Sequence, residues 1–311
     1  MCSDAPCSDE KAAGASVSAA LSRHGWTPDA RRWPNRHASR MVEAGDQRWH
    51  VQTVGEGPSA LLLHGAGAST HSWAPLTPYL AEEFQLTAID LPGHGFTQNL
   101  RNRLPTLPYV AGAVAGLIKT LGIDPVLIVG HSAGAAVMLK LMATGAAPAR
   151  AVSINGALKP FDGPAGHLFP LFAKMLMLNP FTSHFFAWRA QSRARVEALI
   201  GQTGSTAPPE QIDCYEQLLQ RPQHVSGTLA MMANWDLTGL AADMRRMTAP
   251  VTFIAGEKDA AVPPSVSREA AAITPGARYT LLPGLGHLAH EEDPAQIAAL
   301  IRAASGAGAP D

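Results

Sequence analysis

The feature that most constrains the fold is a serine held between two glycines at the junction of a predicted strand and a predicted helix. Residues 126–129, Val-Leu-Ile-Val, form a short apolar run typical of a buried strand. The motif Gly130-His131-Ser132-Ala133-Gly134 follows, and the apolar segment 135–142 after it predicts a helix that ends at Gly145. Such a tight turn is a nucleophile elbow, which lifts the hydroxyl clear of the backbone at the positive end of the helix. The sequence therefore predicts a nucleophilic Ser132.

The two groups that would activate this serine follow it in the chain. Asp259 lies in the loop after the predicted strand 250–255, and His287 comes shortly after the predicted strand 279–282. A serine hydroxyl is a weak nucleophile at neutral pH without a base. We therefore expect His287 to be the general base and Asp259 to fix its tautomer and stabilise its charged form. Two other carboxylates remain alternatives for the acid: Glu257 and Asp236.

The turn after another predicted strand, residues 60–63, supplies the expected oxyanion hole. Its sequence is His64-Gly65-Ala66-Gly67. One backbone N–H would come from Ala66 and the other from Ala133, the residue after the nucleophile. These donors need backbone freedom and no particular side chain, which accounts for the glycines.

Four further histidines and one aspartate are expected to have structural roles. His290 is expected to hydrogen-bond locally at the start of the last helix. His131 is adjacent to the nucleophile, so its side chain is expected to point elsewhere, in a structural or pocket-wall role. His64 and His94 lie in glycine-rich turns that they would organise. Asp90 follows a strand and is expected to pin its turn through bonds to backbone N–H groups.

No metal site and no cofactor is expected. His287 and His290 are three residues apart and two glutamates follow, but this spacing matches neither H-E-x-x-H nor H-x-x-E-H. The three cysteines are an odd number without C-x-x-C spacing, so we expect reduced thiols. The net charge of −1 gives no case for nucleic acid as a partner. A small-molecule substrate is the expected partner.

Strands and helices alternate along most of the chain, which predicts a mainly parallel sheet covered on both faces. The segments 48–54 and 59–63 are separated by Gly55-Glu56-Gly57-Pro58 and predict a hairpin. The further predicted strands are 85–90, 126–129, 151–154, 251–255 and 279–282.

The alternation is interrupted between residues 158 and 240, where several helical stretches and no strand are expected. We interpret 158–240 as a helical cap, 31–157 and 241–305 as the core, and 1–30 as a flexible tail. The apolar cap residues are expected either to pack on the core, to line a wide pocket or to contact a membrane surface. The candidate pocket residues are Phe169, Phe172, Met175, Phe185, Trp188 and Trp235. Because no long apolar run is present, a cytoplasmic protein is expected, with a peripheral membrane contact left open.

The stretch from about residue 33 to 301 resembles the α/β-hydrolase superfamily. The matching motifs are 64–67, 90–95, 130–134, Asp259 and 286–287. This resemblance implies an α/β-hydrolase fold, a mainly parallel sheet flanked by helices with an inserted helical cap. It also implies the chain order serine, acid, histidine.

A narrower resemblance is to the magnesium-chelatase accessory proteins of bacteriochlorophyll synthesis. It is carried by residues 32–36, 67–73, 130–136, 155–158, 230–236 and 282–292, which include non-catalytic residues of the cap and the N-terminal segment. It implies a role beside magnesium insertion into protoporphyrin, with a porphyrin as substrate or ligand and a transient contact with the chelatase. The porphyrin propionates would need cationic donors, and the candidates are Arg189, Arg193 and Arg195.

Three hypotheses follow. The first is a serine hydrolase acting on an ester or thioester in that pathway. The second is a non-enzymatic porphyrin-binding accessory factor that kept the triad. The third is a general carboxylesterase. Epoxide hydrolase and haloalkane dehalogenase chemistry is disfavoured, because those relatives carry an aspartate at the position of Ser132.

Overall fold

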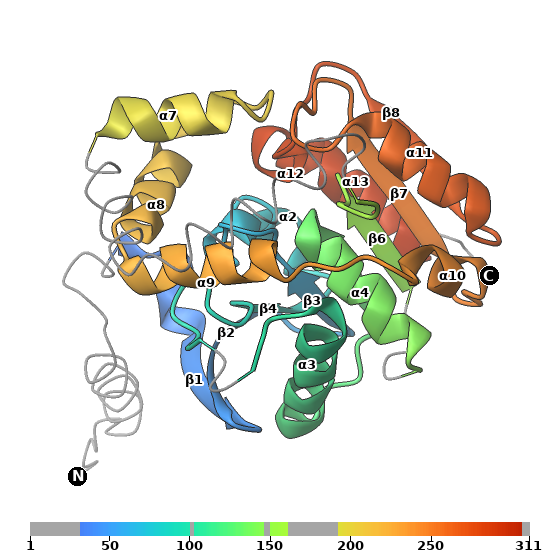
Figure 1. Ribbon diagram of the computed structural model, residues 1–311, viewed down its shortest axis with the longest axis horizontal. Coiled ribbons are helices and arrows are strands. Elements are labelled where there is room, and N and C mark those ends of the chain that lie inside the picture. The colour runs from blue at the N-terminus through green and yellow to red at the C-terminus, as the bar shows by residue number, and fades with distance from the viewer. Residues whose placement is uncertain (1–31, 100–102, 146–149, 161–191, 307–311) are drawn as a thin grey trace, which may run out of the picture.

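An eight-stranded sheet runs through the middle of the molecule (Figure 1). The computed structural model describes residues 32–99, 103–145, 150–160 and 192–306, so the predicted tail lies outside the described part. The spatial order of the strands is β1-β2-β4-β3-β5-β6-β7-β8. Their bounds are β1 Ser39–Ala44, β2 Gln47–Val54, β3 Ser59–Leu63, β4 Gln85–Ile89, β5 Leu127–His131, β6 Arg150–Ile154, β7 Val251–Gly256 and β8 Arg278–Leu282. From β4 to β8 all neighbours are parallel, which confirms the mainly parallel sheet.

The predicted hairpin between the second and third strands is wrong. β2 pairs antiparallel with β1 across a two-residue turn and with β4 on its other side, so β4 separates it from β3. The Gly55–Pro58 connection explains the difference, because it folds over the segment that precedes β4. A Cβ on Gly55, which has φ 85°, would overlap the carbonyl oxygen of Ala81. The connection passes close to this segment and brings the chain to the far side of β4. There β3 pairs with β4 in parallel.

Helices cover both faces of the sheet, and side chains alternate between two apolar cores. In β3, Leu61 and Leu63 pack in the core under α3, α4, α10 and α11. Ala60 and Leu62 pack in the core under α2 and α13. The helix bounds are α2 Thr77–Leu80, α3 Leu107–Leu121, α4 Ala133–Ala143, α10 Leu240–Arg245, α11 Pro264–Ile273, α12 Ala289–Glu292 and α13 Pro294–Ser305. The 3₁₀ turns are η2 Arg36–Ala38 and η3 Thr70–Trp73.

In the described part of the chain, three helices follow β6 and precede α10, and we call them the insert helices. They are α7 Arg193–Gly201, α8 Pro209–Leu219 and α9 Pro222–Ala233. No strand occurs among residues 192–240. The insert helices gather at one side of the sheet (yellow to orange in Figure 1). None of the helices in the described part of the chain is long and apolar enough to cross a membrane.

Candidate active site

Ser132 lies in the turn between β5 and α4, with φ 50° and ψ −116°. A positive φ is unfavourable for a residue with a side chain, so the surrounding structure must hold Ser132 in this conformation. The Ser132 N–H donates to Ile154 O at 3.1 Å, and its own carbonyl accepts from Ala135 and Ala157, both at 3.1 Å. The tight turn predicted from the glycine-flanked serine is therefore confirmed.

Three glycines allow the backbones around Ser132 to approach closely. A Cβ on Gly134 would overlap the carbonyl oxygen of Leu63, and one on Gly130 would lie 2.6 Å from Ala135 Cα. A Cβ on Gly65 would lie 2.9 Å from Ser132 Cβ. The turn 64–67 therefore rests directly against the serine, as an oxyanion turn requires.

The two backbone N–H groups predicted for the oxyanion hole are free of acceptors. Neither Ala66 nor Ala133 donates its N–H to another residue in the described part of the chain. His64 fixes the turn that carries Ala66, because its Nδ1–H donates to Gly65 O at 2.7 Å and its Nε2 accepts from Leu91 N–H at 2.9 Å. Burial lowers the pKa of His64, which keeps the ring neutral for this pair of bonds. The role expected for His64 is confirmed.

His287 and Asp259 form a buried hydrogen-bonded pair. His287 Nδ1 lies 2.7 Å from Asp259 Oδ2. The other carboxylate oxygen accepts the N–H groups of Ala261 at 2.9 Å and Val262 at 2.7 Å, which fixes the carboxylate plane. The bond places a proton on His287 Nδ1 and leaves Nε2 as the basic nitrogen. Nε2 makes no hydrogen bond to any described residue.

The alternative acids do not contact His287. Glu257 is exposed and accepts the N–H of Gly284 at 3.1 Å. Asp236 is exposed and accepts the N–H of Thr238 at 2.8 Å. Among the three carboxylates considered from the sequence, Asp259 alone is paired with the histidine.

Asn155 is a residue of this site that the sequence analysis missed. It follows β6 with φ 49°, and its Nδ2 donates to Asp259 Oδ2 at 2.6 Å and to Gly286 O at 3.4 Å. The amide therefore shares the carboxylate oxygen that His287 uses. The available signal was the Asn-Gly pair after a strand, which favours a positive φ.

His131 links the elbow to the histidine loop. Its Nε2–H donates to the carbonyl oxygen of His287 at 2.9 Å, and the two rings lie 4.7 Å apart between centroids. Burial lowers the pKa of His131 well below its ordinary value, so the ring is neutral. The structural role expected for it is confirmed. The Ser132 hydroxyl has no hydrogen bond to a described residue, so its bond to His287 stays a prediction.

The expectation that His290 hydrogen-bonds locally is wrong. Its Nε2 lies 2.8 Å from Ser72 Oγ in η3, a residue that precedes it by 218 positions. The Ser72 hydroxyl also donates to Glu291, and Tyr215 of α8 donates to the same Glu291 oxygen at 2.7 Å. The reason is that α12 packs against η3, so His290 faces the core and not its own turn. Burial lowers the pKa of His290 to about 3 and raises that of Glu291 to about 7.

Asp90 pins its turn as expected. It accepts backbone N–H groups from Thr70 at 2.7 Å and Phe96 at 2.8 Å. It also bonds His50 Nδ1 at 2.8 Å, and His50 Nε2 lies 3.0 Å from Ser39 Oγ. These three side chains repeat a Ser-His-Asp pattern, but all are buried and Ser39 is only 2% exposed. No substrate reaches this buried set, which ties β1, β2 and β4 together.

Most of the predicted pocket residues lie outside the described part of the chain. These are Phe169, Phe172, Met175, Phe185 and Trp188. Trp235 is described; it is half-buried and packs against the core that contains Leu61 and Leu63. Arg193 is ion-paired with Glu197 and Asp213 on the surface, and Arg189 is not described.

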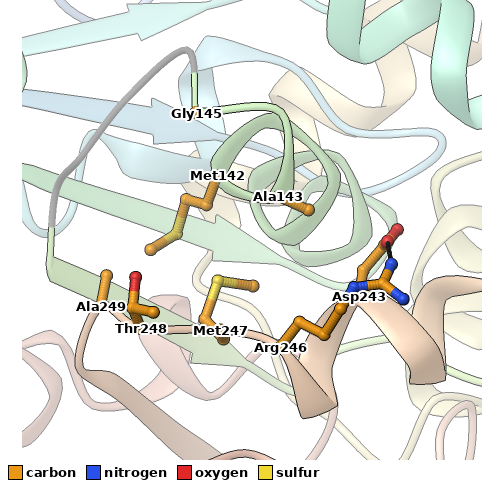
Figure 2. A pocket seen from close by; sticks show the side chains of 8 residues that line it. All are labelled: Met142, Ala143, Gly145, Asp243, Arg246, Met247, Thr248 and Ala249. Atoms are coloured by element: carbon orange, nitrogen blue, oxygen red, sulfur yellow. Dashed lines mark hydrogen bonds and ion pairs between the residues drawn. The ribbon is translucent and has the colours of Figure 1, made fainter.

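Two cavities lie away from Ser132. One, of about 320 Å³, lies between the end of α4 and the approach to β7, where Met142 and Met247 face each other beside the Asp243–Arg246 pair (Figure 2). β5, β6 and β7 are parallel, so the start of β7 and the end of β5 lie at opposite ends of the strands. This cavity is therefore remote from the serine. The other, of about 390 Å³, lies between the β1–β2 turn and α3. No group of three or more His, Cys, Asp or Glu among the described residues could hold a metal ion.

Comparison with known proteins agrees with this architecture. A sequence model of the alpha/beta hydrolase family matches residues 60–300. The chain belongs to the α/β-hydrolase family. It is 40% identical to the magnesium-chelatase 30 kDa subunit of Rhodobacter capsulatus, covering 83% of this chain and 91% of that one.

More distant relatives share the fold. The chain is 28% identical to a pimeloyl-(acyl-carrier protein) methyl ester esterase of Xanthomonas oryzae pv. oryzae, covering 76% of this chain and 91% of the relative. The solved structure of a thermophilic esterase from Thermogutta terrifontis superposes with a TM-score of 0.67 at 22% identity, covering 85% of this chain and 97% of that one.

Proposed function

We propose that this α/β-hydrolase is a serine-type hydrolase that cleaves an ester or thioester. The observation that carries the proposal is Ser132 at φ 50° in the elbow together with a His287–Asp259 pair joined at 2.7 Å. His131, which precedes the serine, hydrogen-bonds to the backbone of His287. The positive φ of Ser132 is a strained backbone conformation for a residue with a side chain. Such strained residues are found preferentially at functional sites. The 28% identical relative named as a methyl ester esterase supports an ester as the substrate class.

In the proposed reaction, Ser132 Oγ attacks the substrate carbonyl carbon while His287 Nε2 takes its proton. The tetrahedral intermediate collapses when the same imidazolium protonates the leaving alcohol or thiol, which leaves an acyl group on Ser132. Water, deprotonated by His287, then attacks the acyl carbon. The imidazolium returns this proton to Ser132 Oγ as the bond between the acyl group and Ser132 breaks and the acid leaves. Asp259, held by Asn155 and two backbone N–H groups, keeps the proton on Nδ1 throughout.

The N–H groups of Ala66 and Ala133 would stabilise the oxyanion in both tetrahedral steps. They have no protein acceptor, and Gly65 brings their two turns into contact. Donors that already point to the position where charge develops are worth about 10²–10³ in rate each. The absent bond between Ser132 and His287 agrees with this scheme, since such bonds often tighten only when substrate is bound.

We also propose an association with magnesium chelatase, where this hydrolase would act beside magnesium insertion into protoporphyrin. Its support is the 40% identity to a protein named as a subunit of that enzyme. That name describes no hydrolysis, so it also favours a second candidate, a porphyrin-binding accessory factor whose triad is unused. Saturable quenching of tryptophan fluorescence by protoporphyrin IX would support porphyrin binding in either case.

Hydrolysis of a short p-nitrophenyl ester tests the enzymatic proposal. Ser132→Ala should lower turnover by roughly 10⁴-fold or more without a change in thermal stability. Equal turnover by Ser132→Ala and wild type, in preparations free of contaminating esterase, would reject serine catalysis. Porphyrin binding without any Ser132-dependent turnover would favour the accessory factor, and turnover without porphyrin binding would favour a general carboxylesterase.

A further inference from the structure

Residues 203–205 form a turn between α7 and α8 that touches both loops that carry the His287–Asp259 pair. Its first residue, Thr203, presents a carbonyl oxygen that accepts the N–H of Ala260 at 3.1 Å and the N–H of His287 at 3.4 Å. Ala260 immediately follows Asp259. We call the loop of Asp259 the acid loop and the loop of His287 the base loop. One carbonyl oxygen of the insert therefore hydrogen-bonds to both loops.

The second residue of this turn is a glycine because the acid loop leaves no room for a side chain. Gly204 has φ 80°, and a Cβ there would overlap the carbonyl oxygen of Lys258. On the other side, a Cβ on Gly286 would overlap the carbonyl oxygen of Gly204. The backbone of Gly204 is thus wedged between the residue before Asp259 and the residue before His287.

The third residue, Ser205, holds the base loop at Leu288, the residue that follows His287. Its Oγ accepts the N–H of Leu288 at 2.8 Å, and the serine is buried at 3% exposure. Beyond it, Glu292 accepts the N–H of Gly286 at 2.9 Å and faces the N–H of Thr206 at 3.5 Å. The N–H groups of both His287 and Leu288 are therefore satisfied by the insert and not by the core.

We propose that Thr203, Gly204 and Ser205 form a clamp that positions the catalytic base, so that His287 is aligned with Asp259 only while the insert helices are docked. This inference rests on the proposed function. A buried N–H that loses its acceptor is unfavourable, so we expect the loop that carries His287 to move if the clamp moves. The docking itself comes from an apolar cluster that joins the two parts: Ala68, Val196, Ile200, Ile212, Tyr215 and Leu288.

Two clamp variants and two controls test this proposal. Ser205→Ala removes one acceptor without adding bulk, and Gly204→Ala forces the acid loop to move. Gly201→Ala is the control in the same insert, because it has open space around it. Gly239→Ala is the control for strain alone, since its φ is 88° and nothing lies within 4 Å of the added Cβ.

The first measurement is the downfield proton NMR resonance of His287 Nδ1–H, which reports the bond to Asp259 whether or not the protein turns over a substrate. We expect this resonance to shift or exchange rapidly in both clamp variants and to be unchanged in both controls. An unchanged resonance in the folded Ser205→Ala protein would overturn the clamp. If Gly204→Ala does not fold, Ser205→Ala decides alone.

The second measurement is ester turnover per folded molecule. The clamp variants should lose up to about 100-fold in kcat, with KM little changed, because a displaced base weakens the chemical step and not substrate binding. Wild-type kcat in folded Ser205→Ala would contradict the clamp. If wild type has no Ser132-dependent turnover, the proposed function fails, while the NMR result still decides whether the insert positions His287.

Discussion

Ser132 occupies a backbone conformation that side chains disfavour, and the glycines around it make that conformation attainable. Gly134 lies under the carbonyl of Leu63, and Gly65 lies against the serine itself. A larger residue at either position would displace the elbow from the turn 64–67. At the scale of the residue, the geometry of this site therefore depends on glycines, which have no side chain, as much as on the reactive side chains.

Replacement of the two neighbouring histidines should separate the base from a structural residue. His287→Ala removes the partner of Asp259, so ester turnover should fall by roughly 10⁴-fold or more. His290→Ala leaves that bond in place and removes a buried ring that lies 4.8 Å from the Trp73 ring between centroids. It should therefore lower stability and cost much less turnover per folded molecule. Turnover and urea unfolding of both variants are the measurement. A larger catalytic loss in His290→Ala would show that the base is assigned wrongly.

Residues with roles set by local motifs were predictable, whereas residues whose partners are remote in sequence were not. The glycines around Ser132 and the strand before Asp259 are visible within a few positions. Asn155 acts on a carboxylate 104 residues away, and His290 acts on a serine 218 residues away. Such pairings depend on which elements become neighbours, and a single sequence does not contain that information directly.

At the scale of elements, the parallel part of the sheet followed from the alternation of strands and helices. The strands from β4 to β8 were each anticipated within about two residues of their observed bounds. β1 was missed because Ser-Arg-Met-Val-Glu-Ala lacks a clear apolar alternation, and four of its six residues remain at least partly exposed. With β1 unseen, the edge pairing of β2 was assigned to the wrong neighbour.

The contact between α8 and α12 should make stability depend on a single buried carboxyl group. Burial raises the pKa of Glu291 from its ordinary value of 4.5 to about 7, so between these pH values the folded protein holds a proton that the unfolded chain releases. This group therefore stabilises the fold at low pH, and its contribution is lost as the pH rises through about 7. Glu291→Gln should abolish that loss.

Urea unfolding of wild type and Glu291→Gln between pH 4.5 and 8 measures this effect. Over that window, the stability of the glutamine variant should increase relative to wild type as the pH rises. Tyr215→Phe is the companion variant, because it removes the hydrogen bond to Glu291 and keeps the ring. A constant difference between wild type and Glu291→Gln at all pH values would contradict the account.

At the scale of the whole molecule, buried histidines should make the fold sensitive to acid. Burial lowers the pKa of six of them, and in three, His71, His94 and His290, to about 3. Below pH 6.5 the unfolded chain binds protons at these rings that the folded protein does not. Each ring therefore contributes stability that is present above pH 6.5 and is lost as the pH falls, at up to about 1.4 kcal/mol per pH unit.

The pH dependence of stability from these six rings is opposite in sign to that from Glu291 alone. The net expectation is therefore a fold whose stability falls steeply between pH 6.5 and 4. Thermal unfolding followed by circular dichroism over that range tests this. His94→Asn should reduce the slope if its lower stability at pH 7 leaves a measurable transition. A melting temperature that stays constant from pH 7 to pH 4 would contradict the neutral, buried state of these side chains.

The central claim is that Ser132 is a nucleophile activated by His287, and covalent labelling tests it most directly. A fluorophosphonate probe, followed by peptide mass spectrometry, reports which side chain reacts without knowledge of the natural substrate. If this claim holds, wild-type protein carries one adduct, on Ser132. Labelling is then at least about 100-fold slower in His287→Ala and absent in Ser132→Ala. An unlabelled Ser132 in folded wild-type protein, or equal labelling rates with and without His287, would contradict it.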